Sequence, residues 1–283
     1  MIWEVFALWL TSVVSTTLQS QNVETDSTSI VVPDGWPYVI NEYNMSEQSP
    51  VDISTKHAVR RFLPFLRTTG YWTLENSQVE IKNTGHTVRV QLANTSDEIP
   101  YVSGGPLFDA KYEFVQLHFH WGKDDFGSEH KVNGHQYAME VHIVHYKKKY
   151  GSYENAQNFI DGICVIGFFG QVTTQNNLEM TNFVDDLKFI ENMNTSIIRP
   201  FKEEFSWIKD TALKQHYYTY HGSLTTPPYA ECVIWIIFTK PIPISRAQLK
   251  KFRNLHSSKN GILINENDRP LQPFNDRPIV YGY

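Results

Sequence analysis

The sequence predicts a sheet-dominated α+β domain with a few peripheral helices. Runs of about 4–8 residues alternate between apolar and polar side chains, which is typical of strands. Helical signals are fewer, and the elements do not form a regular series of alternating strands and helices. After Trp36 the sequence is evenly globular, without repeats or a Gly/Ser-rich linker, which favours one domain. The predicted strands are Val79–Lys82, Val88–Leu92, Val115–His120, Met139–His145, Ile163–Phe169 and Cys232–Phe238.

Two segments carry helical signals. Ser245, followed three residues later by Gln248, resembles a capping box and predicts a helix over Arg246–Leu255. Asn177–Ile190 is the second predicted helix. Both helices are expected at the periphery of the sheet.

The composition excludes several classes of protein. Hydrophobic residues make up 41% and aromatic residues 14% of the 283 residues, which is enough for a large core and excludes a disordered chain. The 25 basic and 30 acidic residues give a formal net charge of −5, so the chain as a whole shows no basic footprint for nucleic acid or an anionic membrane. Two cysteines exclude a disulfide-stapled scaffold and a thiolate zinc module. We expect Cys164 and Cys232 to be buried free thiols rather than a disulfide.

The N-terminus has the pattern of a secretory signal peptide. Ile2–Val14 is largely apolar, is followed by small polar residues, and is too short to span a bilayer of about 30 Å. Glu4 and the lack of Lys or Arg depart from the usual pattern, so a buried N-terminal segment is the alternative. We expect residues 1–20 to be removed by cleavage within residues 15–21, residues 21–33 to form a flexible leader, and residues 34–283 to form the domain.

Secretion would make three sequons candidate sites of N-glycosylation, at Asn44, Asn94 and Asn194. The sequence has no second apolar run that approaches the length of a membrane span, and its C-terminal residues lack the hydrophobic tail of a lipid-anchor signal. We therefore expect a secreted, extracellular monomer without a membrane anchor.

The 11 histidines, beside only two cysteines, point to imidazole chemistry. In the predicted strand Val115–His120, alternation puts His118 and His120 on one face, where both can converge on one ion. If the predicted strand Met139–His145 lies next to it, His142 supplies a third imidazole. Three neutral imidazoles leave one tetrahedral position of Zn²⁺ open for water, which is the arrangement of a catalytic zinc site.

Two polar residues precede these histidines on the same strand faces. Gln116 stands two residues before His118, and Glu140 stands two residues before His142. Each is well placed to bond the ring nitrogen that does not bind metal. A His-x-His pair alone is more often half-exposed surface, and on that basis four others are expected to be structural or surface residues: His57, His130, His135 and His145.

Longer motifs surround these residues in a fixed order. They are Gln48–Ile53 (QSPVDI), Gln116–Gly122 (QLHFHWG), Gly127–His130 (GSEH), Glu140–His145 (EVHIVH), Gly222–Pro228 (GSLTTPP) and Asn267–Pro270 (NDRP). This series resembles the α-class carbonic anhydrases, over about Trp36 to Tyr283. The resemblance implies a single domain around a large twisted, mostly antiparallel sheet, with zinc in a conical cleft. By motif position, the implied zinc ligands are His118, His120 and His142.

The resemblance also implies a reaction, the reversible hydration of CO₂ to bicarbonate and a proton by attack of zinc-bound hydroxide. Thr225 would accept a hydrogen bond from the hydroxide and donate its own proton to Glu129, because a carboxylate only accepts. His86 would shuttle the proton to buffer, since an imidazole with a pKa near 6.5 both takes up and releases protons. The CO₂ site would be formed by Val144, Val165, Leu224, Thr225, Thr226 and Trp235.

Each implied role has a simpler alternative. Thr225 and Thr226 precede two prolines and also fit a turn, His86 follows a glycine and also fits a surface turn, and the apolar wall also fits core packing. As a whole, the chain is alternatively a catalytically weak or silent carbonic-anhydrase-like binding protein. The zinc ligands and the Thr–Glu pair, present together, favour the enzyme. A zinc peptidase is disfavoured because the chain has no H-E-x-x-H motif.

The chain departs from the family at several positions. Ser27 stands near the place of a tyrosine that joins the proton-relay water network in relatives, which puts the efficiency of proton transfer in question. Tyr43 and Tyr229 stand where secreted members often carry a pair of cysteines. His221 replaces a residue that is commonly Pro or polar, with no consequence that the sequence alone reveals.

Overall fold

A twelve-stranded sheet organises the residues that the computed structural model describes, which are 46–71, 77–93, 98–209, 216–257 and 261–283. The predicted signal peptide, the leader and the sequons at Asn44 and Asn94 lie outside these residues. Along its main path the strands are, in spatial order, β12 (Ser196–Pro200), β4 (Gln78–Asn83), β5 (Val88–Leu92), β7 (Tyr112–Trp121), β10 (Met139–Lys147), β11 (Ile163–Thr173), β14 (Val233–Ser245), β13 (Tyr217–Gly222), β15 (Val280–Gly282) and β2 (Val59–Arg61).

The direction of the strands confirms the predicted architecture. Neighbours in this sheet are antiparallel except in the pairs β11–β14 and β15–β2. Two short strands branch from it, β3 (Arg67–Thr69) and β6 (Tyr101–Ser103), of which β6 also pairs with β7. A separate small sheet contains β1 (Asp52–Ile53), β8 (Lys131–Val132) and β9 (His135–Gln136). The result is a single sheet-dominated domain.

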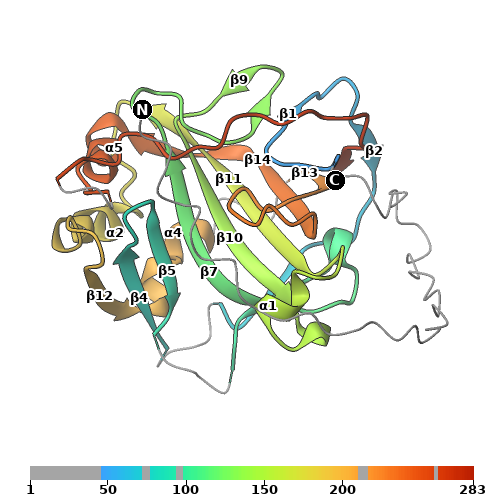
Figure 1. Cartoon of the computed structure of the whole chain (residues 1–283), viewed down its shortest axis with the longest axis horizontal. Coiled ribbons are helices and arrows are strands. Elements are labelled where there is room, and N and C mark those ends of the chain that lie inside the picture. The colour runs from blue at the N-terminus through green and yellow to red at the C-terminus, as the bar shows by residue number, and fades with distance from the viewer. Residues whose placement is uncertain (1–45, 72–76, 94–97, 210–215, 258–260) are drawn as a thin grey trace, which may run out of the picture. The chain divides into compact units, whose positions relative to one another are not determined.

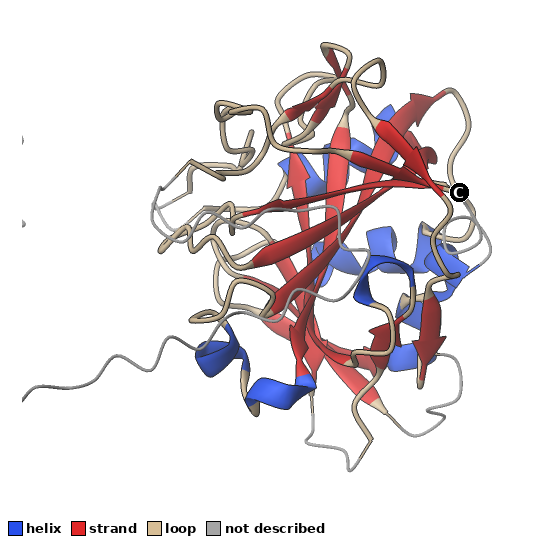
Figure 2. Cartoon of the chain, turned by 90° about the vertical axis from the view of Figure 1, so that its right-hand side faces the viewer, coloured by secondary structure: helices blue, strands red, loops and turns tan. Residues whose placement is uncertain are grey.

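Short helices accompany the strands at the periphery, as the sequence predicts (Figure 2). The α-helices are α1 (Tyr153–Ala156), α2 (Thr181–Asp186), α3 (Phe201–Glu204), α4 (Ser206–Lys209) and α5 (Arg246–Arg253). Single 3₁₀ turns are η1 (Gly105–Leu107), η2 (Lys148–Tyr150) and η3 (Leu187–Phe189).

Of the two predicted helices, one begins where the sequence predicts and the other is shorter than predicted. The α5 helix begins at the predicted capping box, in which the Ser245 hydroxyl accepts the Gln248 backbone N–H and the Gln248 side chain accepts the Ser245 N–H. The predicted helix over Asn177–Ile190 is shorter, because α2 begins only at Thr181. Asn177 instead forms a turn, in which its side-chain oxygen accepts the Glu179 backbone N–H at 3.1 Å. Its side-chain amide also donates to a carbonyl at the end of β14.

The β14 strand extends seven residues beyond its predicted end at Phe238, through two prolines at 241 and 243. Its antiparallel partner β13 is paired only as far as Phe238. Beyond that point β14 pairs with β11 alone, up to Ser245. A proline is tolerated there because its missing N–H faces a side of the strand that has no partner.

Four central strands, β7, β10, β11 and β14, run side by side across the sheet (Figure 1). One face of β7 is buried through Leu117 and Phe119, so its histidines lie on the opposite face. On β11 and next to β14, Cys164 and Cys232 are buried free thiols, as the sequence predicts. Burial raises the pKa of both thiols, so neither is a reactive thiolate near neutral pH. Together the four central strands form the platform that carries the polar face of β7.

Candidate metal centre

Three histidines from two neighbouring strands meet on this platform. His118 and His120 lie on β7, and the antiparallel register sets His142 of β10 directly opposite His118. The ring centroids lie 5.0 Å apart for His118 and His120, 5.1 Å for His118 and His142, and 4.6 Å for His120 and His142. The structure thus brings together the three residues that the sequence predicts as zinc ligands.

The nitrogen atoms of these rings fit a tetrahedral ion. One nitrogen from each ring lies within 4.8 Å of the other two, and His142 Nδ1 lies 3.3 Å from His118 Nε2. Ligand nitrogens bound at about 2.0–2.1 Å in a tetrahedral zinc site lie roughly 3.3–3.4 Å from one another. His120 Nε2 is buried and has no hydrogen-bond partner among the described residues. The donor set therefore fits zinc.

Two acceptors orient the rings. His142 Nε2 donates to Glu140 Oε1 at 2.8 Å, which leaves the lone pair of Nδ1 directed at the other imidazoles. His120 Nδ1 donates to the backbone carbonyl of Asn267 at 3.1 Å, which leaves Nε2 as the free atom. Such outer partners fix the tautomer and direction of a metal-binding histidine. Glu140 acts as the sequence predicts, whereas Asn267 was not predicted in this role.

Gln116 does not bond the ring of His118 in this structure. His118 Nδ1 is buried without a hydrogen-bond partner in the part of the chain that the structure describes. The Gln116 side chain instead faces a cavity whose wall also contains His118. Alternation places the two residues on one face, but it does not set the side-chain torsions that a hydrogen bond needs.

The electrostatics favour neutral imidazoles, the form that binds metal. Burial lowers the pKa of His118 well below its usual 6.5, and the nearby rings of His120 and His142 lower it further. Burial also lowers the pKa of His142, although Glu140 opposes this effect. For Glu140 itself, burial raises the pKa, but the attraction of His130 and His142 outweighs burial and holds the pKa well below 4.5.

A second cluster, formed by His130, Glu140 and His142, is a hydrogen-bond network. Glu140 Oε1 accepts His130 Nδ1–H at 2.7 Å, and Glu140 Oε2 accepts the His130 backbone N–H at 2.8 Å. His130 Nε2 lies 2.6 Å from the hydroxyl of Tyr220. Because these polar atoms already pair with one another, this cluster supports the metal centre rather than forming a second one.

A cavity of about 30 Å³ opens beside His118 and His142. Its lining combines apolar side chains with imidazole, hydroxyl and amide groups. Its walls contain the six residues predicted to form the CO₂ site, Val144, Val165, Leu224, Thr225, Thr226 and Trp235, together with Gln116 and Tyr153. Space for a small molecule requires roughly 10–15 Å³ per water-sized occupant. The cavity therefore suits a ligand of very few atoms.

Comparisons with known proteins agree with this geometry. The sequence profile of the eukaryotic-type carbonic anhydrases matches residues 31–283. Carbonic anhydrase 7 of Mus musculus is 37% identical over 259 residues, which is 89% of this chain and 94% of that protein. Carbonic anhydrase 3 of Bos taurus is 36% identical over 267 residues, covering 89% and 95%.

The chain belongs to the eukaryotic-type carbonic anhydrases. This membership makes it a lyase by class, with zinc as its cofactor and with CO₂ and bicarbonate as the substrate class of its family. The α-class resemblance read from the sequence motifs is thereby confirmed. Among the residues that the structure describes, the cluster of His118, His120 and His142 fits this ion.

In this carbonic anhydrase chain, the predicted hydrogen bond from Thr225 to Glu129 is not formed. Glu129 Oε1 accepts the backbone N–H of Arg269 at 2.9 Å and lies 3.3 Å from His120 Nδ1. Glu129 Oε2 is buried, lies 3.8 Å from His142 Nδ1 and, within the described ranges, has no hydrogen-bond partner. Thr225 lines the cavity and is only 9% exposed. Oε2 is therefore the acceptor that remains for the Thr225 hydroxyl.

His86 lies on the exposed turn between β4 and β5 and does not line the cavity. Its backbone carbonyl accepts the Asn267 side-chain amide at 2.9 Å. The same amide donates to the Phe119 carbonyl, and the Asn267 side-chain oxygen accepts the Trp121 N–H at 2.7 Å. Asn267 thus ties the turn that carries His86 to the strand that carries two of the imidazoles.

Sequence reasoning missed Tyr153 and Asn267. Tyr153 begins α1 and reaches the cavity wall, although nothing in its local sequence marks it. Asn267 opens the NDRP motif, which signals the family but not the contact. The four histidines expected to be structural or surface residues, His57, His130, His135 and His145, stay outside the cavity wall.

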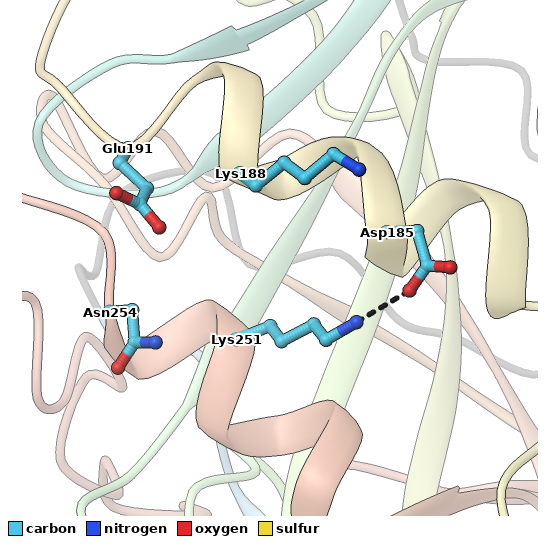
Figure 3. A pocket seen from close by; sticks show the side chains of 5 residues that line it. All are labelled: Asp185, Lys188, Glu191, Lys251 and Asn254. Carbon is cyan, nitrogen blue, oxygen red and sulfur yellow. Dashed lines mark hydrogen bonds and ion pairs between the residues drawn. The ribbon is translucent and has the colours of Figure 1, made fainter.

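A second cavity, of about 380 Å³, lies between the α2–η3 segment and α5 (Figure 3). Its lining is charged and contains Asp185, Lys188, Glu191, Lys251 and Asn254. Lys251 Nζ already pairs with Asp185 Oδ1 at 2.5 Å, and both side chains are about half exposed. With balanced charges and no imidazole, this cavity offers none of the chemistry found beside His118.

Proposed function

We propose that the chain catalyses the reversible hydration of CO₂ to bicarbonate and a proton. The observation that carries this proposal is the position of His118 and His142 on the wall of a small cavity that is also lined by apolar side chains. CO₂ is small and uncharged, so the apolar part of that lining suits its binding. Val144, Val165, Leu224 and Trp235 supply this surface, and Thr225 and Thr226 face it with hydroxyl groups.

Bound zinc would supply a Lewis acid that makes water a nucleophile at neutral pH. His118, His120 and His142 would hold the ion, and Glu140 and Asn267 keep two of these rings in the tautomer that binds it. On these strands His120 and His142 are buried, and His118 is half-buried. The protein thus holds the ligands in place before the substrate arrives.

Thr225 and Glu129 would act as one unit that orients the nucleophile. Thr225 would donate its hydroxyl proton to Glu129 Oε2, the buried oxygen without a hydrogen-bond partner, and would then offer only its lone pairs to the nucleophile. Arg269 supports this arrangement, because its backbone N–H occupies Oε1.

His86 would receive the proton that the reaction releases and pass it to buffer. Its exposure at the β4–β5 turn gives the imidazole access to solvent, and Asn267 links that turn to His120. Histidine is the side chain most often used to shuttle protons in enzymes.

Zinc analysis combined with a CO₂ hydration assay tests the enzyme proposal. We expect about one zinc ion per chain, and hydration that disappears on chelation and returns with added zinc. A protein that binds zinc fully but hydrates CO₂ no faster than buffer would be the silent, carbonic-anhydrase-like binding protein instead. The same assay tests the role of Thr225 when Thr225→Ala, which removes the hydroxyl, is compared with Thr225→Ser, which retains it and is the matched control.

We further propose that the protein is of the secreted type, with residues 1–20 as a signal peptide, 21–33 as a leader and 34–283 as the domain. The support is Ile2–Val14 with the small residues after it, and the three sequons, of which Asn194 is exposed beside β12. Among the described residues, no helix is both long and apolar enough to cross a membrane.

Expression in a eukaryotic secretory cell tests the localisation. We expect a glycosylated monomer in the medium that lacks about its first 15–21 residues. Mass shifts on glycosidase treatment, compared among Asn44→Gln, Asn94→Gln and Asn194→Gln, identify the used sites. Intact chain that starts at Met1 in the cytosol would overturn secretion and leave the enzyme proposal standing.

A further inference from the structure

A segment at the edge of the main sheet exposes large apolar side chains next to arginines. We call Val59–Arg67, whose sequence is VRRFLPFLR, the β2 loop, because it begins on β2. Phe62 is 77% exposed and Phe65 is 84% exposed. The β2 strand is the last strand of the sheet path and lies beside the C-terminal end of the chain (Figure 1).

The charge of this segment is opposite to that of the whole chain. Between Asp52 and Glu75 the sequence contains no acidic residue, although the chain carries a net charge of −5. Arg67 pairs with Asp109 at 2.9 Å. Arg60 and Arg61 are exposed and form no ion pair within the described ranges. The net charge is a sum over the whole chain, so it does not reveal this local cluster of positive charge.

In a protein without a binding partner, the exposed arginines of the β2 loop have an explanation, but its exposed phenylalanines do not. Charged side chains on an edge strand protect it from pairing with other sheets, which accounts for Arg60 and Arg61. The same protection is weakened by two nearly fully exposed aromatic rings, since exposed apolar surface promotes association. Phe62 and Phe65 therefore point to a binding role.

The backbone holds the tip of the β2 loop in place. Leu66 is buried and anchors the loop in the core. The Pro64 carbonyl accepts the Gly105 backbone N–H at 3.0 Å. Gly104, with a φ of +77°, lies so close to the Phe65 carbonyl that a Cβ there would clash at 2.1 Å. An anchored tip loses little conformational freedom on binding.

We propose that the β2 loop binds an anionic phospholipid surface. Phe62 and Phe65 enter the boundary between headgroups and acyl chains, and Arg60 and Arg61 contact the anionic headgroups. Protruding rings suit a lipid surface because it requires no complementary pocket, and adjacent basic residues add electrostatic attraction. A second copy of the chain is disfavoured, because a symmetric contact would oppose arginine to arginine.

Vesicle co-sedimentation of the zinc-loaded mature protein tests this proposal. We expect binding to vesicles of phosphatidylserine and phosphatidylcholine, little binding to phosphatidylcholine alone, and weaker binding at high salt. Phe62→Ser with Phe65→Ser should weaken binding at least about tenfold. Arg60→Gln with Arg61→Gln should weaken it at least about fivefold and reduce its dependence on salt.

Matched controls separate the loop from general surface effects. Leu178→Ser removes a side chain that is also 84% exposed, and Lys240→Gln with Lys250→Gln removes two exposed cations elsewhere. Both controls should bind vesicles like the unchanged protein. None of these residues contacts the metal centre, so CO₂ hydration should be equal in all variants, and vesicle binding fails or succeeds independently of the enzyme proposal.

Three outcomes would overturn the proposal. The first is equal binding to anionic and neutral vesicles, or none to either. The second is an equal loss of binding in Leu178→Ser and in the double phenylalanine variant. The third is binding of a labelled, Glu-rich peptide in the absence of vesicle binding, which would assign the β2 loop to an acidic protein partner.

Discussion

The buried histidines form two groups that differ in what their second ring nitrogen contacts. In the metal centre, His120 and His142 each have one nitrogen held by the protein, through Asn267 and Glu140, and one directed at the other imidazoles. His130 has both nitrogens engaged, by Glu140 and the Tyr220 hydroxyl.

His221 belongs to the second group, with Nδ1 on the Glu47 carboxylate and Nε2 on the Ile160 carbonyl. It is as buried as the metal-centre histidines, so burial alone does not distinguish the groups. The distinguishing property is convergence, because one ring nitrogen each of His118, His120 and His142 lies within 4.8 Å of the other two. His145 also has a nitrogen without a hydrogen-bond partner among the described residues, but it lies in no such group.

The largest expected effect is the loss of an imidazole from the first group. His118→Ala should lose zinc and CO₂ hydration together, because two nitrogens do not complete the site. His221→Ala is the control, and should keep zinc while losing about 1–3 kcal/mol of unfolding free energy, since Glu47 and the Ile160 carbonyl lose their partner. Metal analysis and urea unfolding measure the two outcomes. An unchanged zinc content in the His118→Ala variant would show that His118 does not belong to the metal centre.

The next largest effect is expected from substituting Thr225, which lines the cavity together with His118 and His142. Thr225→Ala should lower kcat on the order of 10²-fold, as for the loss of a group that stabilises the transition state. Adding Glu129→Gln should lower kcat little further, because residues that act as one unit are not additive. Stopped-flow hydration assays of the single and double variants measure this, and fully multiplicative losses would separate the two residues.

Glu140 accepts hydrogen bonds from His142 of the metal centre and from His130 of the second group, so its substitution tests how the two groups are coupled. Glu140→Gln should weaken zinc binding about 10–100-fold, since the amide replaces one acceptor with a donor facing His130 or His142. Competition with a chelator measures the affinity. Gln116→Ala is the control with a much smaller expected change, because Gln116 makes no bond to His118. Equal losses in the two variants would contradict the geometry.

Acid should destabilise the metal-free protein through two histidines of the metal centre and through His145. Burial lowers the pKa of His118 and His142, and lowers that of His145 to about 3. Below about pH 6.5 the unfolded chain therefore binds protons that the folded chain does not. Unfolding free energy should fall by up to about 1.4 kcal/mol per pH unit for each such histidine. Urea unfolding between pH 7.5 and 5 tests this, with His145→Phe expected to give a shallower slope.

The smallest effect is expected at His86, an exposed histidine outside both groups. His86→Ala should reduce kcat, by less than about tenfold, and leave kcat/KM for hydration nearly unchanged, because only proton release depends on it. Imidazole buffer should restore the lost rate. An unchanged kcat in weak buffer would return His86 to the role of a turn residue.

Local patterns predicted the central strands, because their alternation reflects contacts on both faces of one strand. The register that sets His142 opposite His118 follows from two such strands being neighbours. The β13 strand was missed because its sequence, YYTYHG, shows neither an alternation of apolar and polar residues nor a continuous aliphatic run. The three-residue strands β2 and β15 exist only through partners that lie far away in sequence.

Contacts between residues far apart in sequence also limit what can be predicted of the site. The histidines and Glu140 were predictable, since residues two apart on a strand share a face. Asn267 contacts His120 across 147 positions, and no periodicity reports such a contact. The expected bonds from Gln116 to His118 and from Thr225 to Glu129 are missing, because they depend on side-chain torsions that alternation along a strand does not set.

The contact between His120 and Asn267 has a consequence for synthesis on the ribosome. At about 5–20 residues per second, His120 is made roughly 7–30 s before Asn267 is added. During that time its ring lacks the carbonyl that fixes its tautomer, and β7 lacks the amide that ties it to the His86 turn. We expect zinc to be captured tightly only after the chain is nearly finished, so nascent chains that end before residue 267 should release the metal to a chelator that the complete protein resists.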